Sequence, residues 1–168
     1  MGISNSRFVN NKIKDSGIGI YSIDGSSNDF VGNIITNSDF GFISWNTISN
    51  AYEKITDNTF KENNYGIGIA SNNLLVKGNT VESSAECGII SMSYRDSLIY
   101  NNNFIDSKAS ACIVGPEYVS IWSQNKQGNY WSDYTGFDSN GDGIGDTPYT
   151  IDANNIDNYP YINKDGWK

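Results

Sequence analysis

The sequence contains no histidine, and this absence removes several classes of function. Without an imidazole there is no His-dependent acid–base catalysis and no His-ligated metal site. Only two cysteines are present, Cys87 and Cys112. They are too few for a disulfide framework and lack the paired spacing of a zinc site, and the sequence leaves open whether they are joined to each other.

Basic residues and long apolar runs are also scarce. Eleven Lys and Arg stand against 19 Asp and Glu, which gives a formal net charge of −8. Binding to a phosphate backbone needs clustered basic side chains, so we expect no nucleic-acid partner. Uncharged apolar runs such as residues 87–92 are far too short to cross a bilayer, and residues 1–4 do not resemble a secretory signal. We expect no membrane insertion, and any export signal should lie outside this sequence.

The residues that are abundant form an internal repeat of about 22 residues. An asparagine is followed two positions later by a large apolar residue at Asn11/Ile13, Asn33/Ile35, Asn58/Phe60, Asn79/Val81 and Asn102/Phe104, and Asn125 continues the spacing without the apolar partner. About eight residues after most of these asparagines comes a small residue and then a second short apolar segment, such as residues 66–69. This period suits three short strands with tight turns. The sequence therefore predicts an all-β parallel β-helix of about five to six coils over residues 3–127.

The stacking of such coils assigns structural roles to the repeated residues. The apolar partners should lie over one another as an inward ladder, and the asparagines should tolerate left-handed turns and bond from coil to coil. Parallel coils leave an open edge at each end, which a cap or more chain must cover. Because the sequence starts inside a coil at residues 3–9, we expect this chain to be the C-terminal part of a longer protein.

Residues 128–168 form a second region, in which aromatic residues, Asp and Gly replace the repeat. We expect this region to be a cap, with Trp131 closing the apolar core and six further aromatics covering the last coil: Tyr130, Tyr134, Phe137, Tyr149, Tyr159 and Tyr161. No one of these rings is assigned to a ligand.

The run from Asp138 to Asp146 has the donor spacing of a calcium loop. Oxygen donors at loop positions 1, 3, 5, 7 and 9 are Asp138, Asn140, Asp142, the carbonyl of Ile144 and Asp146, and Gly143 occupies the sharp turn at position 6. Position 12 is Tyr149 instead of the bidentate Glu of an EF-hand, and a further carboxylate could come from Asp133, Asp152 or Asp157. The alternative is an ordinary Asp/Gly turn without an ion. We predict a Ca²⁺ site that stabilises the cap.

The combination of Asn-spaced coils, residues 128–134, residues 138–149 and residues 157–161 resembles the NosD-like parallel β-helix proteins with PbH1 repeats, especially surface and secreted members common in archaea. The resemblance covers essentially the whole chain. It implies a right-handed β-helix, export to the cell surface or periplasm, and kinship with carbohydrate-binding and sugar-hydrolase modules. The family name is tied to copper delivery, but the only soft ligands here are Cys87, Cys112, Met1 and Met92, so we expect no copper role for this segment.

The best catalytic candidates are carboxylates four residues after an Asn of the repeat: Asp15, Glu62 and Asp106. Neighbouring members would lie two coils apart, about 9–10 Å, at the wide end of the separation used by inverting glycosidases. The same residue types also favour solvated turns, and this is the preferred interpretation. We therefore expect a non-catalytic module, with a fragment of a polysaccharide lyase or glycoside hydrolase as the alternative.

Exposed aromatic residues at loop positions provide the candidate ligand site. Tyr21, Trp45, Tyr52 and Tyr94 could stack on sugar rings, although each could also pack over the coil surface. The leading prediction is an extracellular or cell-surface module that is structural and binds a polysaccharide or surface glycan. A purely architectural role, as an envelope or filament subunit that self-associates or joins upstream coils, is the third alternative.

Overall fold

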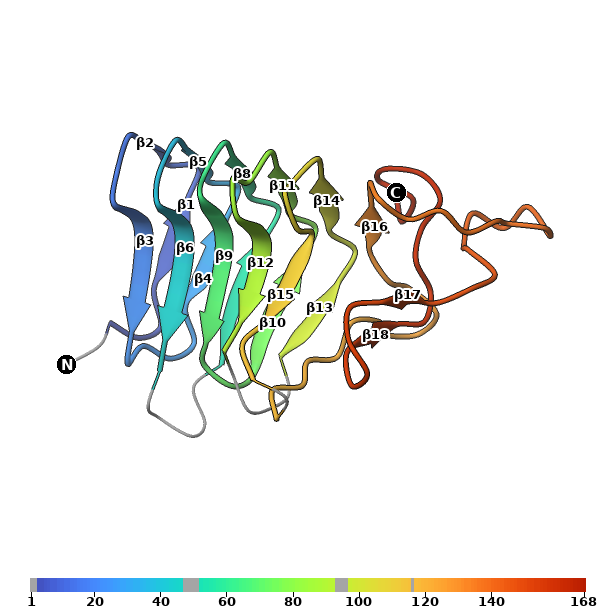
Figure 1. Ribbon diagram of the computed structural model, residues 1–168. Helices are drawn as coiled ribbons and strands as arrows, with labels where there is room; N and C mark the ends of the chain where they lie inside the picture. Colours follow the sequence, from blue (N-terminus) through green and yellow to red (C-terminus); the bar gives the residue numbers. More distant parts are fainter. Residues whose placement is uncertain (1–2, 47–51, 93–96, 116) are drawn as a thin grey trace.

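The computed structural model of the protein describes residues 3–46, 52–92, 97–115 and 117–168. The described strands form three parallel sheets that wrap around one core, and the described residues contain no helix (Figure 1). The first sheet contains β1 (Arg7–Val9), β4 (Asp29–Val31), β7 (Glu53–Thr56), β10 (Leu74–Lys77) and β13 (Leu98–Tyr100). The second contains β2 (Lys12–Lys14), β5 (Ile34–Thr36), β8 (Thr59–Lys61), β11 (Thr80–Glu82), β14 (Asn103–Ile105) and β16 (Tyr130–Trp131). The third contains β3 (Ile18–Ile23), β6 (Phe40–Trp45), β9 (Tyr65–Ala70), β12 (Cys87–Ser91) and β15 (Ala111–Ile113).

One strand of each sheet makes one coil, so the predicted parallel β-helix is confirmed. The register places the predicted apolar residues over one another, as in the pairs Ile35 with Phe60 and Val81 with Phe104. These four side chains are at most 1% exposed. Full burial of such a side chain contributes roughly 1.5–3 kcal/mol. The ladder is therefore the central element of the core.

The glycine at the second position of β3, β6, β9 and β12 is required by packing. A Cβ atom on Gly66 would lie 2.3 Å from Cγ1 of Val81, and the corresponding glycines of neighbouring coils meet similar obstacles. The third sheet thus approaches the second too closely for any side chain here. This explains why a glycine recurs about eight residues after the asparagine.

The repeated asparagines form a buried ladder of side-chain amides. Nδ2 of Asn58 donates to Oδ1 of Asn79 at 2.9 Å, and Nδ2 of Asn79 donates to Oδ1 of Asn102 at the same distance. Each Oδ1 also accepts the backbone N–H of the preceding asparagine. The left-handed conformation, however, belongs to the residue before each asparagine, as at Asp57 and Asn101 with φ near 55°. The predicted coil-to-coil hydrogen bonds are confirmed. The left-handed conformation was predicted for the asparagine itself and belongs to the residue before it.

The last rung of the amide ladder is Asn129, and the expected continuation at Asn125 was wrong. Nδ2 of Asn102 donates to Oδ1 of Asn129 at 3.0 Å. The chain makes an additional tight turn between Gln124 and Gln127, which bond each other through their backbones, so the rung comes four residues later. Asn125 lies in this turn with φ of 52°.

A disulfide joins Cys87 of β12 to Cys112 of β15, across neighbouring coils of the third sheet. Their Cα atoms are 6.3 Å apart. The described residues therefore hold no free thiol. The pairing that the sequence left open is a crosslink between the fourth and fifth coils.

Aromatic stacking closes the C-terminal end of the core. The ring of Trp131 lies between Phe104 and Tyr149, with centroid distances of 4.6 and 4.3 Å. Trp131 and Tyr161 are at most 4% exposed. Phe137 does not join them, because its side chain is 81% exposed, so the expectation that it covers the coil was wrong. Residues 136–148 belong to a loop that extends away from the stack, drawn in orange at the right of Figure 1.

Asp157 terminates the amide ladder from β18 (Ile156–Asp157), which pairs antiparallel with β17 (Tyr149–Thr150). One carboxylate oxygen accepts the backbone N–H of Asn129 at 2.7 Å, its Nδ2 at 3.3 Å and Nε1 of Trp131 at 2.9 Å. Burial raises the pKa of Asp157 to about 6 in spite of these donors. A carboxylate offers no donor, so the ladder ends at this residue.

Candidate functional site

The three catalytic candidates lie in one column of turns between the second and third sheets. Asp15, Glu62 and Asp106 have φ of 55°, 56° and 47°, and Asn37 and Ser83 occupy the same place in the intervening coils. Nδ2 of Asn37 bonds the Asp15 carboxylate, and this bond is the main cause that lowers the pKa of Asp15. A left-handed turn position explains why short polar residues recur here. The structure brings the candidates into one column, as predicted, and gives them a role in turn geometry.

The Asp/Gly loop is organised by its own side chains. The Asp138 carboxylate accepts the backbone N–H groups of Gly141 at 2.7 Å and Gly143 at 2.8 Å. Oδ1 of Asp142 accepts the N–H of Ile144, and a carboxylate oxygen of Asp146 accepts that of Ser139. The hydrogen bonds to Ser139 lower the pKa of Asp146. Gly141 and Gly143 adopt positive φ of 74° and 86°, as the sharp turn requires.

The three further carboxylates considered for this loop are engaged elsewhere. Asp133 accepts the Tyr149 hydroxyl, Asp152 accepts the N–H groups of residues 154 and 155, and Asp157 terminates the amide ladder. Among the described residues, no three Cys, Asp or Glu side chains converge as a metal ligand set. Calcium binding at Asp138–Asp146 would therefore depend on the Asn140 amide and the Ile144 carbonyl in addition to carboxylates.

The donor set does not fit copper. The whole sequence lacks histidine, and both cysteines are consumed by the disulfide. Met92 is the single thioether in the described part of the chain. Copper sites are built from imidazole, thiolate and thioether ligands, which this segment does not assemble.

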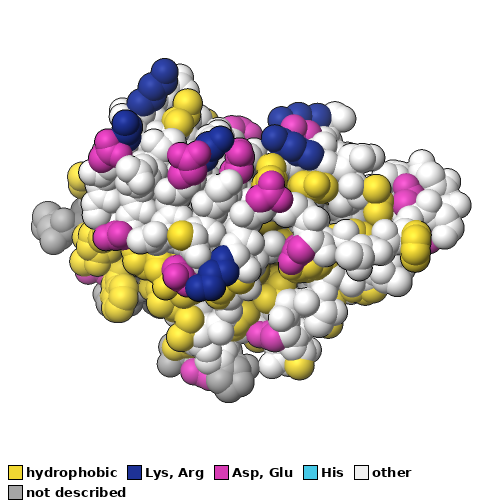
Figure 2. Space-filling model, turned by 45° about the horizontal axis from the view of Figure 1, so that its top comes forward, with side chains coloured by type: hydrophobic (Ala, Val, Ile, Leu, Met, Phe, Trp, Pro, Cys, Tyr) yellow, Lys and Arg dark blue, Asp and Glu magenta, His cyan; other side chains and the backbone are white. Residues whose placement is uncertain are grey.

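The third sheet differs from the other two because its strands contain no charged residue. The first sheet carries Arg7, Asp29, Glu53, Lys54 and Lys77, and the second carries Lys12, Lys14, Lys61 and Glu82. Figure 2 shows most Lys and Arg side chains in the upper part of the view, whereas apolar side chains gather at its lower left. In a chain of net charge −8, one uncharged sheet is a strong local asymmetry.

Aromatic and aliphatic side chains cover the outer face of this sheet. Tyr21 and Trp45 are each 48% exposed and lie on neighbouring strands, and the rings of Phe40 and Tyr65 stack at 4.7 Å. Two of the four predicted sugar-contacting residues are thus brought to one face. Tyr52 is also exposed but precedes β7, where the Lys54 ammonium lies 5.8 Å from its ring. Tyr94 lies outside the described residues.

Sequence reasoning did not identify Glu53, which is a fully buried carboxylate inside the coil stack. Its oxygens accept the hydroxyl of Ser22 at 2.6 Å, Nδ2 of Asn28 at 2.9 Å and the hydroxyl of Ser44 at 3.0 Å. Ser44 also bonds Ser71 at 2.7 Å. The only signal in the sequence was the serine at matching positions of β3, β6 and β12. This polar cluster faces the interior and is not accessible to a glycan.

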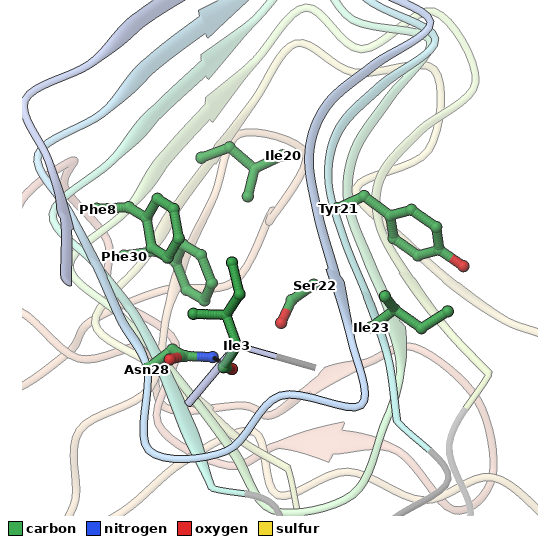
Figure 3. Close-up of a pocket in the computed structure, with 8 residues that line it drawn as sticks. All are labelled: Ile3, Phe8, Ile20, Tyr21, Ser22, Ile23, Asn28 and Phe30. Carbon is green, nitrogen blue, oxygen red and sulfur yellow. Dashed lines mark hydrogen bonds between the residues drawn. The ribbon is translucent and has the colours of Figure 1, made fainter. Parts of the chain in front are cut away.

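A pocket of about 300 Å³ opens at the N-terminal end of the stack. Its lining residues are Ile3, Phe8, Ile20, Tyr21, Ser22, Ile23, Asn28 and Phe30 (Figure 3). Ile3, Phe8, Ile20 and Phe30 point toward its interior, whereas the side chains of Tyr21 and Ile23 point away from it. The described residues also contain no helix of the length and hydropathy that a membrane span requires.

Comparison with known proteins gives a consistent family assignment. The sequence model of the family described as "Periplasmic copper-binding protein (NosD)" matches residues 1–136. A protein of Pseudomonas aeruginosa named "Probable ABC transporter binding protein NosD" is 34% identical over 79 residues, which are 47% of this chain and 18% of that protein. A protein of the same name from Stutzerimonas stutzeri is 35% identical over 81 residues, 45% of this chain and 18% of its own length. The matches thus span less than a fifth of either relative.

Proposed function

This chain belongs to the NosD family of parallel β-helix proteins, and from that membership we propose that it is a non-catalytic module of an exported protein that binds a surface polysaccharide. The observation that carries the proposal is the uncharged, aromatic outer face of the third sheet. Flat rings such as those of Tyr21 and Trp45 can stack on the apolar faces of sugars, and an uncharged face favours a neutral glycan.

An exported location agrees with the family description, which is periplasmic, and with the disulfide. Disulfides persist in oxidising compartments and are rare in the cytosol. We place the module in the periplasm or at the cell surface. Copper handling, which the family name suggests, is not assigned to this segment because its donors do not fit that metal.

A catalytic role as a lyase or glycoside hydrolase finds less support. The three carboxylates of the turn column are two coils apart and occupy left-handed turn positions. The hydrogen bond from Asn37 lowers the pKa of Asp15, which is the opposite of what a general acid needs. The substitutions Asp106→Asn and Glu62→Gln test this alternative, because release of reducing or unsaturated ends that disappears in either variant would establish an enzyme.

Binding to soluble and insoluble neutral polysaccharides tests the proposal directly. The double variant Tyr21→Ala/Trp45→Ala should lose binding, whereas Phe137→Ala removes a still more exposed ring outside the third sheet and should bind as the parent does. Equal binding by all three proteins would refute the assignment to the third sheet. If no glycan is retained and the parent chain self-associates through this face, an architectural role as an envelope or filament subunit replaces the proposal.

We further propose that Ca²⁺ stabilises the cap through Asp138, Asn140, Asp142, Ile144 and Asp146. Support comes from the alternation of oxygen donors and from the two glycines with positive φ. Melting should shift to higher temperature with CaCl₂ and back with EDTA, and Asp142→Ala should abolish this shift. The matched control is Asp39→Ala, which removes an exposed carboxylate in a coil turn. A melting curve indifferent to both CaCl₂ and EDTA would refute the site.

A further inference from the structure

We propose that a pocket in the cap binds an alkylammonium group, such as that of a free organic amine or of a lysine side chain. The pocket has a volume of about 430 Å³ and lies between the two stems of the Asp/Gly loop, residues 133–137 and 147–150. We call it the cap pocket. None of its lining residues belongs to a strand of the third sheet, so it is distinct from the surface proposed above to bind a glycan.

The walls of the cap pocket are fixed by contacts within the protein. The hydroxyl of Tyr134 donates to the carbonyl of Thr147 at 2.6 Å and so joins the two stems. A Cβ atom on Gly136 or on Gly145 would overlap this hydroxyl, so the tyrosine ring occupies space that only glycine leaves open. The pocket is therefore preformed, which reduces the entropy lost when a ligand binds.

The hydrogen-bonding groups of the pocket favour a ligand that donates. The hydroxyl of Tyr149 donates to the Asp133 carboxylate at 2.9 Å, so both tyrosine hydroxyl hydrogens of the pocket are committed inside the protein. Burial, together with the charge of Asp133, raises the pKa of Tyr149, and its hydroxyl stays protonated. The carboxylate also accepts the hydroxyl of Ser110 at 3.0 Å and, with about four lone-pair sites, retains capacity to accept. An alkylammonium group has donors and no acceptor, so it complements these groups.

The segment that builds the cap pocket carries charge of one sign. Residues 128–163 contain six aspartates and no lysine or arginine. No ion pair within the described part of the chain includes Asp133. Such an excess of negative charge attracts cations and disfavours anionic ligands. Because the Asp133 side chain is exposed and screened by solvent, we expect dissociation constants in the millimolar range.

Aromatic rings surround the carboxylate. Phe137 is 81% exposed, more than any other large hydrophobic residue that the structure describes, and the rings of Tyr134 and Tyr149 meet edge to face at 6.4 Å. Ammonium groups are attracted to the faces of aromatic rings within about 6 Å, and the methylene stem of such a ligand can cover an apolar ring. A neutral sugar could also stack on Phe137 but would gain nothing from the negative charge. The combination of rings, a carboxylate and no basic residue therefore favours a cation with an apolar stem.

Titration with n-pentylamine, followed by chemical shifts in NMR spectra, tests the proposal. At neutral pH this probe carries an ammonium group, and its matched control is n-pentanol, which has the same carbon chain but no charge. The amine should shift the resonances of residues 133–137 and 147–150, and the alcohol should bind at least about fivefold more weakly. The full chain is used with CaCl₂ present, so that the result does not depend on whether the Asp/Gly loop needs calcium. The same titration with Nα-acetyl-lysine amide distinguishes a lysine side chain from a free amine as the source of the group.

Two substitutions connect binding to the groups of the pocket. Asp133→Asn removes the charge but keeps an acceptor for Tyr149, and Phe137→Leu removes the ring but keeps an apolar side chain. Each should weaken amine binding by about threefold or more, whereas the control Asp39→Asn, at an exposed carboxylate in a coil turn, should leave it unchanged. Unchanged resonances of the coil strands verify that the variants fold. Equal binding of amine and alcohol, no shift at the two stems, or an unchanged affinity in either Asp133→Asn or Phe137→Leu would overturn the proposal.

Discussion

Replacing Asn79 by leucine tests whether the amide ladder stabilises the coils. Asn79 is fully buried, and its Oδ1 accepts two bonds from Asn58. Its Nδ2 donates to the carbonyl of Ile55 at 2.8 Å and to Oδ1 of Asn102 at 2.9 Å. Leucine has a similar volume but satisfies none of these groups, so the polar groups on both neighbouring coils would be left buried and unpaired.

Each buried group that loses its partner costs about 1–3 kcal/mol, so several together should cost roughly 4–6 kcal/mol. That is a large fraction of the roughly 5–15 kcal/mol by which a domain is stable. The matched control is Asn64→Leu, because Nδ2 of Asn64 makes an exposed bond to Asp39 and its loss should cost less than about 1 kcal/mol.

Urea unfolding followed by tryptophan fluorescence measures both changes, and hydrogen exchange locates them. Coil stacks can unfold in parts, so exchange should increase most in β8, β11 and β14, the strands flanking the lost rung. A cost for Asn79→Leu no larger than that of Asn64→Leu would refute the view that the ladder is a major source of stability.

Three further predictions concern buried groups. The folded-state pKa of Asp157, about 6, lies above its ordinary value of 3.8, so protonation favours folding: the stabilisation is complete below pH ~3.8 and is lost as pH rises through 6. The difference amounts to about 3 kcal/mol, and Asp157→Asn should flatten the pH profile of stability between about pH 4 and 6. An unchanged slope in that window would contradict the assignment. The disulfide Cys87–Cys112 joins residues 25 positions apart, so its reduction should lower the free energy of unfolding in urea by about 3–4 kcal/mol. The stability of the Cys87→Ser variant should not respond to reductant. A parent protein whose stability is unchanged by reductant would count against the crosslink. Glu53→Ala should destabilise the protein by about 3 kcal/mol because three donors lose their acceptor. Glu53→Gln retains the shape of the side chain and should cost clearly less. A larger loss of stability in Glu53→Gln than in Glu53→Ala would be inconsistent with these hydrogen bonds.

The coil architecture could be predicted from the sequence because its signal is periodic. Each coil needs a buried amide, an inward apolar residue and a glycine where two sheets approach closely. The pattern of Asn58, Phe60 and Gly66 therefore recurs in the neighbouring coils. The same periodic pattern did not predict which asparagine forms the last rung of the amide ladder. Asn125 and Asn129 are chemically identical, and only the turn between residues 124 and 127 decides which one reaches the ladder.

The surface and the interior polar groups were harder to predict. Tyr21 and Trp45 were identified as exposed aromatics, but the uncharged face that unites them appears only when residues 22 to 25 positions apart are placed on neighbouring strands. The alternation of β7 places Glu53 on the same face as buried Ile55, but a charged side chain is normally exposed to solvent. Its burial depends on polar partners from other coils, such as Ser22 and Ser44, which no local pattern reveals.

The amide ladder gives the stack an electrical direction. Successive peptide groups along a strand point alternately to the following and the preceding coil, so their dipoles largely cancel. The side-chain carbonyls of Asn33, Asn58 and the later rungs, in contrast, all face the preceding coil. The aligned side-chain dipoles add, with their positive end toward the C-terminal cap. Asp157 places a carboxylate at that end, much as an acidic residue is favoured at the N-terminus of an α-helix. The stack therefore resembles a polarised rod whose positive pole carries its own counter-charge.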